Sequence, residues 1–344
     1  MPTSRPPLLA ATPPAVAPVR NAGRRPRFSV MVPTCEPDDK LLAALNSVLQ
    51  QAPGPDRMQL AVVDDASRTV DVQRLIRTID PSGRIEFVAN ARRLGLSGNW
   101  NRAIELARGE LVHLLHQDDA IHTGFYVRID RGFEAQPHVG MAFCRSRIID
   151  DEGRLIKRTS RQRWLAGVIG QWLPRIAERQ RVQTPAAVVA RSTYETLGGY
   201  RPELCHAVDW EMWVRIAGHF DVWYEPRTLA TYRRHVANET TRLFATGAVW
   251  PDMARAIRLN ALSLPDSIRS STLAASIRWH AASAIRTAER QLAAGDTAAA
   301  AATLRAIPDL LEAAEGHATD GVPHHRIAQL RARLGGGVPR RWAA

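Results

Sequence analysis

The chain has 344 residues, of which 45% are hydrophobic and 23% are charged, a composition that can bury a core and a length that suggests about two domains. Lys and Arg number 46 against 34 Asp and Glu, a formal net charge of +12, and the only lysines are Lys40 and Lys157. An anionic partner and a codon bias toward arginine explain this charge equally well. The three cysteines stand far apart without a CxxC pair, which argues against a disulfide scaffold and against a thiolate zinc site.

Residues 1–26 are rich in Pro, Ala and Arg and show no periodicity, so we expect a disordered leader. No stretch of about 18 uncharged apolar residues occurs, and no membrane-spanning helix is expected. Prolines interrupt the apolar run that a signal peptide requires. The sequence therefore predicts a cytoplasmic protein, and contact with the inner face of a membrane stays open as an alternative.

Between residues 27 and 245, short apolar runs alternate with helical periodicities, which predicts an α/β domain with a mixed, mainly parallel sheet. Strands are expected at 28–32, 60–63, 85–88, 111–115 and 228–232. Helices are expected at 41–49, 72–79, 99–107 and 206–217. Residues 246–344 hold no strand-like run, and their Ala-rich stretches predict a helical C-terminal region.

Two of the expected strands each end in a pair of aspartates, Asp64–Asp65 and Asp118–Asp119. In open parallel sheets, ligands bind beyond the carboxyl ends of the strands. Adjacent carboxylates at one edge are unfavourable without a cation or a donor-rich ligand, and Mg²⁺ takes one or two carboxylates together with phosphate oxygens. A single pair would be read as caps of the following helices or turns. Two pairs at one edge favour a cation that bridges substrate phosphates.

Six segments between Phe28 and His235 carry the most specific signal. They read VMVPTCEP, VVDDAS, NARRLGLSGNWNRAIELARGELVHLLHQDD, TPAAVVARSTYETLGGYRPEL, HAVDWEMWVRIA and LATYRRH. In this order and spacing they resemble the inverting glycosyltransferases of family 2. The resemblance implies a GT-A fold, a nucleotide-diphosphate sugar as donor, and Mg²⁺ or Mn²⁺ as cofactor.

The resemblance also implies which residues bind the nucleotide sugar. They are Pro33, Thr34, Glu36, Asp64, Asp65, Asn90, Arg93, Gly95, Ser97, Asn99, Asp118 and Arg233. The residue types suit this role, because glycine permits close approach of a ligand to the backbone and the planar fork of arginine binds phosphate. Neither a GxGxxG string nor a P-loop occurs, which disfavours a dinucleotide or ATP site.

Gln117, Asp118 and Asp119 occupy the position of the family's DxD motif, with glutamine in place of the first acid. The resemblance implies that Asp119 binds the metal ion and that His235 completes the metal shell or contacts the diphosphate. It further implies that Asp209 deprotonates the acceptor hydroxyl, with a helix cap as the alternative role. We expect His113 and His116 to lie in the core rather than to act as ligands.

These assignments predict an inverting transfer of a sugar to a saccharide or lipid-linked acceptor in the synthesis of cell-surface polysaccharide or glycoconjugate. One alternative is a nucleotidyltransferase that makes a nucleotide sugar, but the Gly-rich, Lys-bearing loop of such enzymes is missing. A non-catalytic anion-binding or nucleic-acid-binding protein is another, but the arginines are spread over the whole chain and no nucleic-acid partner is expected. Residues 158–184, basic and bearing Trp164 and Trp172, predict an acceptor-side lid, a peripheral membrane contact or an ordinary solvated helix.

Overall fold

The computed structural model describes residues 12–20, 23–234, 239–313 and 321–334. Its strands form one sheet in the order β3-β2-β1-β4-β9-β6-β10-β5, and β7 and β8 pair with β6 and β10, respectively. The strands are β1 (Phe28–Thr34), β2 (Met58–Asp64), β3 (Glu86–Ala89), β4 (Leu111–Leu114), β5 (Ala120–Ile121), β6 (Val139–Ile149), β7 (Leu155–Arg158), β8 (Gly167–Val168), β9 (Ala187–Ala190) and β10 (Asp221–Arg233).

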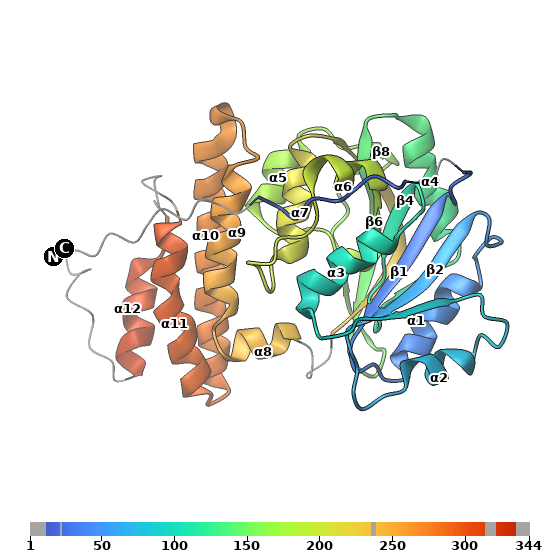
Figure 1. Ribbon diagram of the computed structural model, residues 1–344. Helices are drawn as coiled ribbons and strands as arrows, with labels where there is room; N and C mark the ends of the chain where they lie inside the picture. The colour runs from blue at the N-terminus through green and yellow to red at the C-terminus, as the bar shows by residue number, and fades with distance from the viewer. Residues whose placement is uncertain (1–11, 21–22, 235–238, 314–320, 335–344) are drawn as a thin grey trace.

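The helices that follow or cover these strands lie on both faces of the sheet and in a C-terminal group (Figure 1). They are α1 (Lys40–Leu49), α2 (Val72–Arg77), α3 (Gly95–Leu106), α4 (Phe125–Ala135), α5 (Trp172–Glu178), α6 (Arg191–Leu197), α7 (Val208–Ala217), α8 (Glu239–Ala245), α9 (Val249–Ala261), α10 (Asp266–Ala293), α11 (Thr297–Glu312) and α12 (His324–Arg333). A 3-10 turn, η1, spans Thr184–Ala186.

The sheet is mixed, and its longest pairings are parallel. β1 runs parallel to β2 and β4, β2 runs parallel to β3, and β6 runs parallel to β10. β9 is antiparallel to both β4 and β6 and joins the two parallel groups. The carboxyl ends of β1, β2 and β4 therefore meet at one edge, as the aspartate pairs predict, and the predicted α/β fold class is confirmed.

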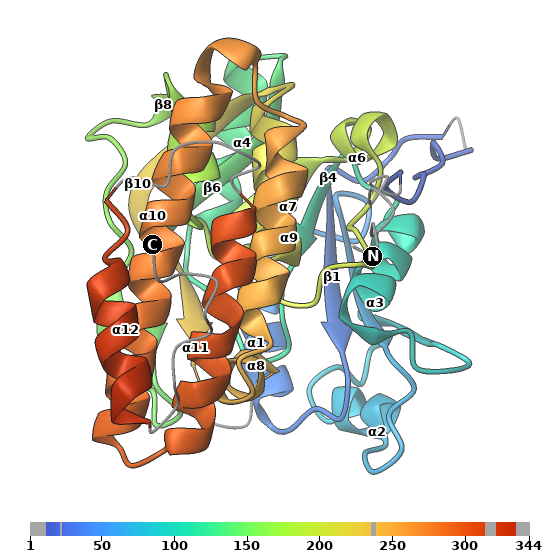
Figure 2. The same cartoon turned by 90° about the vertical axis from the view of Figure 1, so that its left-hand side faces the viewer.

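Successive side chains along the strands pack into two hydrophobic cores, one on each face of the sheet. In β1, Val30 and Val32 belong to the core with α1 and α4, whereas Met31 belongs to the larger core on the other face. The larger core continues into the C-terminal helices, because α5 and α7 pack against α10 and α9. Figures 1 and 2 show α9–α12 side by side along this side of the sheet, and the predicted helical C-terminal region is confirmed.

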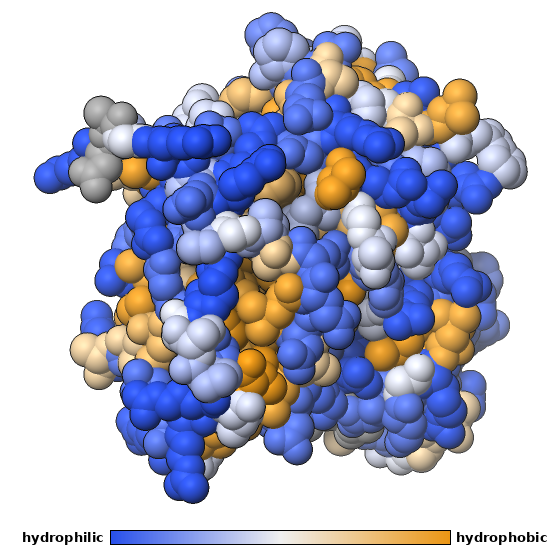
Figure 3. All heavy atoms as spheres, turned by 90° about the vertical axis from the view of Figure 1, so that its right-hand side faces the viewer, coloured by the Kyte–Doolittle hydropathy of each residue, from blue (hydrophilic) through white to orange (hydrophobic). Residues whose placement is uncertain are grey.

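Figure 3 views the molecule from the end that lies opposite α9–α12. Figure 3 shows that this face is mainly hydrophilic, with small hydrophobic areas scattered across it. The strand at that end of the sheet, β3, is only partly buried. No helix among the described residues is long and apolar enough to cross a membrane.

In two segments the structure differs from the prediction. Residues 12–20 of the expected disordered leader pack on the domain: Val16 is buried in the larger core, and the carbonyl of Ala17 accepts a hydrogen bond of 2.9 Å from Arg191. An extended Pro-rich chain can pack in this way without any periodic signal in its sequence. Within residues 158–184, Trp172, Ile176 and Ala177 bury one side of α5 in the core, whereas the part before β8 is mostly exposed.

Candidate active site

Several predicted site residues meet around a cavity of about 380 Å³ at the carboxyl edge of the sheet. His116 and Asp118 reach it from the end of β4, and Asp209 reaches it from the first turn of α7. Tyr232 and Arg234 reach it from the end of β10. The structure thus brings the DxD-like segment and the predicted base, which are far apart in sequence, to one cavity.

The residues at the end of β4 form a group that fits a cation. Ligand atoms of His116, Asp118 and Asp119 lie within 4.8 Å of one another. Asp119 Oδ1 accepts a hydrogen bond of 2.9 Å from the Arg233 backbone N–H, but Oδ2, 3.5 Å from His116 Nδ1, is buried without a hydrogen-bond partner among the described residues. His116 Nε2 is likewise buried and unpaired there. Unsatisfied buried polar atoms are rare and costly, and a bound ion would satisfy Oδ2 of Asp119.

The charges of this group interact strongly with one another. Burial, together with the charge of Asp118, raises the pKa of Asp119. Burial alone would lower the pKa of His116, but its interaction with Asp119 raises it overall. The expectation that His116 lies in the core is therefore wrong, since its ring faces these carboxylates. His113 is a core residue as expected, hydrogen-bonded to Tyr126 and to the carbonyl of Pro185.

Asp209 stands in the first turn of α7, two residues beyond the N-cap Ala207. Its Oδ2 accepts a hydrogen bond of 3.0 Å from Thr184 Oγ1, and its Oδ1 accepts one of 2.7 Å from the Trp210 N–H. Burial raises the pKa of Asp209 to about 6. A carboxylate that titrates near neutral pH in a cavity wall is suited to take a proton from a bound hydroxyl.

Glu211, the next acid along α7, is not available for this role. It is buried, and its carboxylate binds Arg201 at 3.0 Å and Arg215 at 2.8 Å. The three side chains form an ion-pair network beneath the helix. Asp209 is therefore the acid of α7 that faces the cavity.

A residue of the C-terminal region fixes the loop that leads into α7. The carboxylate of Asp252, in α9, accepts hydrogen bonds from the backbone N–H groups of Cys205, His206 and Ala207 at 2.8–3.0 Å. This role of Asp252 could not be predicted from its position, because an aspartate in the first turn of a helix ordinarily indicates only a favourable interaction with the helix dipole.

Much of the predicted nucleotide-binding set forms a hydrogen-bond network inside the protein. Asp65 accepts from Asn90 Nδ2 and from the backbone N–H groups of Leu94 and Gly95, so it caps α3. Asn90 also donates to Asn99. Asn99 in turn donates to backbone carbonyls of β1 and β2. These side chains hold the ends of β1 and β2 against α3 and shape the edge of the sheet.

Nearby side chains order the remaining loops at this edge. Glu36 accepts from the backbone N–H groups of Arg68 and Thr69 and pairs with Arg93 at 3.2 Å. Hydrogen bonds from Thr69 and from these backbone groups lower the pKa of Glu36 to about 2. Asp64 accepts from the N–H and hydroxyl of Ser67.

Three more predicted residues lie in this edge of the sheet. Pro33 lies in β1 in register with Val63, and Ser97 donates to the carbonyl of Leu204 at 3.2 Å. Gly95 adopts φ +77° at the start of α3, a conformation that favours glycine.

Gln117 connects the ends of β4 and β1. Its amide oxygen accepts from Thr34 Oγ1 and from the backbone N–H of Cys35, and its amide nitrogen donates to the carbonyl of Cys35. An aspartate here could accept the first two bonds but could not donate the third. Glutamine thus gives this position a structural connection in place of a negative charge.

Arg233, the arginine predicted to bind phosphate at the end of β10, does not line the cavity. The guanidinium of Arg233 donates to the backbone carbonyls of Asp118, Asp150 and Asp151, whereas Arg234 lines the cavity. Successive strand residues point to opposite faces, so Arg234, and not Arg233, brings its positive charge to the cavity wall. His235 lies outside the described residues.

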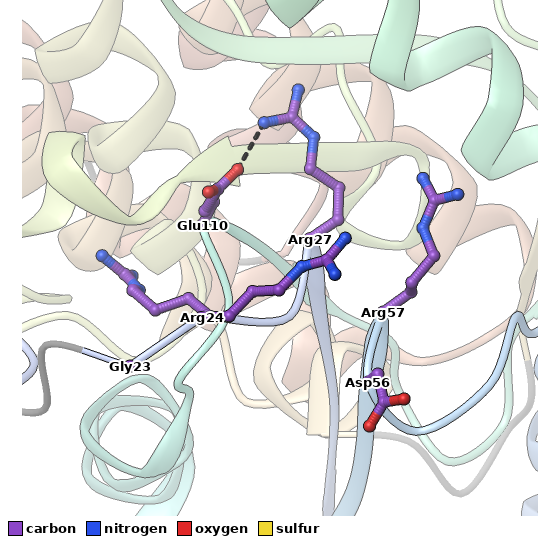
Figure 4. A pocket seen from close by; sticks show the side chains of 7 residues that line it. Gly23, Arg24, Arg27, Asp56, Arg57 and Glu110 are labelled. Carbon is purple, nitrogen blue, oxygen red and sulfur yellow. Dashed lines mark hydrogen bonds and ion pairs between the residues drawn. The ribbon is translucent and has the colours of Figure 1, made fainter.

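A separate hollow of about 430 Å³ lies at the amino ends of β1 and β2. Figure 4 shows its arginines, with Arg27 bound to Glu110 at 2.6 Å. Because ligands of such sheets bind at the carboxyl edge and none of the predicted site residues lines this hollow, it is distinct from the candidate active site.

Comparison with known proteins agrees with this arrangement. Residues 29–196 match the model of the family described as Glycosyl transferase family 2. An uncharacterized protein of Mycobacterium tuberculosis is 30% identical over 269 residues, which are 74% of this chain and 82% of that protein. An uncharacterized glycosyltransferase of Methanocaldococcus jannaschii is 24% identical over 195 residues, 56% of this chain and 64% of that protein.

Solved structures share the fold. S. aureus TarS 1-349 in complex with UDP-GlcNAc has a TM-score of 0.63 at 15% identity, with 90% of this chain and 88% of that chain covered. The chain spans 43% of a longer TarS structure. The mannosyltransferase PcManGT from Pyrobaculum calidifontis, in complex with GDP-Man and Mn²⁺, has a TM-score of 0.51 at 19% identity, with 94% and 84% covered. Together with the fold and the cavity, these similarities show that the chain belongs to glycosyl transferase family 2 and has the GT-A fold.

Proposed function

We propose that this glycosyltransferase moves a sugar from a nucleotide-diphosphate sugar to an acceptor hydroxyl with inversion at the anomeric carbon. The observation that carries the proposal is the position of Asp209, which lines the same cavity as His116 and Asp118. A cation-binding group and a buried carboxylate of raised pKa are the two parts that such a displacement needs. The complexes of the two structural neighbours contain UDP-GlcNAc and GDP-Man, which supports a donor of this class.

Asp119, Asp118 and His116 would hold a divalent ion, and Mg²⁺ and Mn²⁺ are the candidates. The unpaired Oδ2 of Asp119 and the imidazole of His116 fit such an ion. The imidazole favours Mn²⁺, because Mg²⁺ prefers a shell made only of oxygen. When bound, the ion supplies positive charge that offsets the charge of the donor's diphosphate. His235 stays a predicted additional ligand.

The donor would lie along the edge formed by β1, β2 and the start of α3. The hydrogen-bonded network of Asp65, Asn90 and Asn99 would shape the surface on which the base and ribose lie. Not all of these side chains would contact the nucleotide themselves. Arg234, which lines the cavity, and Arg93, which pairs with Glu36 at the same edge, would bind the phosphates. Arg233 would hold Asp118 and Asp119 in place through its hydrogen bonds to them. Arginine suits phosphate because its fork binds two oxygens at once.

Asp209 would act as the general base. As the acceptor oxygen attacks the anomeric carbon, its proton passes to the Asp209 carboxylate, and the bond from that carbon to the diphosphate oxygen breaks on the opposite face. The nucleoside diphosphate leaves with the bonding electrons, and one displacement inverts the configuration. Thr184 and the Trp210 N–H hold the carboxylate in place. A saccharide or lipid-linked acceptor, in the synthesis of cell-surface polysaccharide or glycoconjugate, is the proposed class.

A product analysis tests this proposal. The full chain is incubated with a panel of nucleotide sugars and Mn²⁺ or Mg²⁺, and the released nucleotide and the anomeric configuration of the product are determined. Release of a nucleoside diphosphate with an inverted product supports the proposal. In a parallel incubation with nucleoside triphosphates and sugar 1-phosphates, release of pyrophosphate would indicate a nucleotidyltransferase. Retention of configuration in the transfer product would exclude the single displacement.

A further inference from the structure

The segment 155–165, which includes β7 and leads toward β8, exposes an unusual amount of hydrophobic surface. Trp164 and Leu165 are 80% and 74% exposed, and Leu155 and Ile156 are each 48% exposed. By contrast, Trp100, Trp172, Trp210, Trp213 and Trp250 are all buried. Exposed large apolar residues gathered in one short segment of a folded protein are typical of an interaction surface.

The same segment is strongly basic and contains no acidic residue. Its four basic residues are Lys157, Arg158, Arg161 and Arg163, and within the described part of the chain no ion pair joins any of them to a carboxylate. The guanidinium of Arg161 lies 4.3 Å from the centre of the Trp164 ring. Asp150 and Glu152, which precede the segment, both form ion pairs with Arg154. Positive charge and exposed apolar surface therefore coincide.

This surface adjoins the candidate active site. β7 pairs with β6, with Lys157 opposite Ile148, and both residues line the cavity that also contains Asp209. Trp164 and Leu165 do not line the cavity. A partner bound to the segment would therefore lie beside this cavity.

We propose that segment 155–165 docks this protein on an anionic lipid bilayer, with Trp164 and Leu165 in the interfacial region and the basic side chains on the headgroups. Tryptophan prefers the membrane interface, and a basic patch adds attraction to anionic lipids. Three aliphatic side chains favour hydrocarbon over nucleic acid, which binds through stacking on aromatic rings. A second copy of the chain would bring the same positive charge against itself.

Docking in this orientation would present the cavity to an acceptor carried in the membrane. This step rests on the proposed function, because it assigns the acceptor to the lipid-linked class. The docking itself does not depend on the proposed function. Membrane binding and donor turnover are therefore measured separately.

Co-sedimentation of the full chain with vesicles tests the docking. Vesicles of phosphatidylcholine mixed with phosphatidylglycerol should bind the protein, vesicles of phosphatidylcholine alone should bind it much less, and added salt should weaken the binding. Each basic residue near such a surface changes the partition about fivefold, so Arg158→Gln with Arg161→Gln should weaken binding by about 25-fold. Trp164→Ala with Leu165→Ala should also weaken it strongly. Val127→Ala and Leu262→Ala, at residues 64% and 65% exposed elsewhere, are the matched controls.

Several outcomes would overturn the docking. One is that the wild-type chain binds neither kind of vesicle. Another is that the Trp164→Ala, Leu165→Ala variant binds anionic vesicles as strongly as the wild type. A third is that the control variants lose as much vesicle binding as that variant does. Loss of donor hydrolysis by that variant without vesicles would assign the segment to a lid, and loss of a dimer would assign it to a second copy. If the wild-type chain binds vesicles but hydrolyses no nucleotide sugar, the docking stands and the proposed function fails.

Discussion

Replacing Asp209 by asparagine separates the role of a catalytic base from that of a structural carboxylate. The variant keeps the side chain's size but cannot accept a proton from the acceptor. Transfer should fall by about 10²–10⁴-fold, the range for loss of general-base assistance, which is about 3–5 kcal/mol of barrier. Affinity for the nucleotide sugar should change little, because the base contacts the acceptor.

The same substitution has a predictable effect on stability. Burial raises the pKa of Asp209 from 3.8 to about 6, and one pKa unit corresponds to about 1.4 kcal/mol, so ionisation at neutral pH costs the folded state about 3 kcal/mol. Because the folded pKa is the higher one, the wild-type chain loses this stability as pH rises from about 4 to beyond 6. Asparagine does not titrate, so the variant's advantage in unfolding free energy should grow over that interval. Loss of one hydrogen bond lowers the advantage by about 1 kcal/mol at every pH.

Urea denaturation across this pH range, transfer kinetics and donor-binding calorimetry measure the three quantities. Asp56→Asn, at an exposed carboxylate on the opposite edge of the sheet, is the matched control and should change none of them. For the wild-type enzyme, kcat/KM should rise with pH through about 6, since the base acts only when ionised. Transfer within a few-fold of wild type, or a stability difference independent of pH, would refute this reasoning about Asp209.

Three further substitutions address other parts of the molecule. Asp119→Asn should abolish metal-dependent turnover, because it removes the anionic oxygen of the cation group; near-normal activity at low Mn²⁺ would remove Asp119 from the metal site. Deletion of residues 1–20 should lower the unfolding free energy by about 2 kcal/mol, since it exposes the pocket of the buried Val16, and an unchanged melting temperature would show that this contact is unimportant. Asp252→Ala should cost about 3 kcal/mol or more, because it leaves three backbone N–H groups without their acceptor, and it should reduce kcat more than it raises KM for the donor; an effect on stability alone would exclude a positioning role.

The parts of the fold that the sequence predicts well are those with a strong local pattern. β1, β2 and β4 are short apolar runs that end in polar residues, and α7 has a clear helical period. The start of α3 was expected at Asn99 but lies at Gly95. Asp65, thirty residues earlier, caps this helix through two backbone N–H groups, and such a distant cap leaves no local signal.

Within the site, residue type was easier to predict than side-chain direction. Asp118 and Asp209 were expected near the substrate and do line the cavity. Arg233 was expected to bind the diphosphate, but it is Arg234 that lines the cavity. Irregular pairing in β10 between Glu225 and Ala230 resets the alternation of its side chains, so the sequence alone could not tell which arginine faces the cavity.

The carboxylate of Asp252 ties the helical region to the backbone that leads into α7 and the proposed base. Any opening of α9 releases the backbone that precedes α7 and with it the orientation of the proposed base, even while the sheet and the donor-binding edge remain intact. Proteins open locally in cooperative units with free energies below that of global unfolding. Thermal inactivation of transfer should accordingly follow the loss of amide hydrogen-exchange protection in α9 and α10, at temperatures where β1, β2 and β4 are still protected.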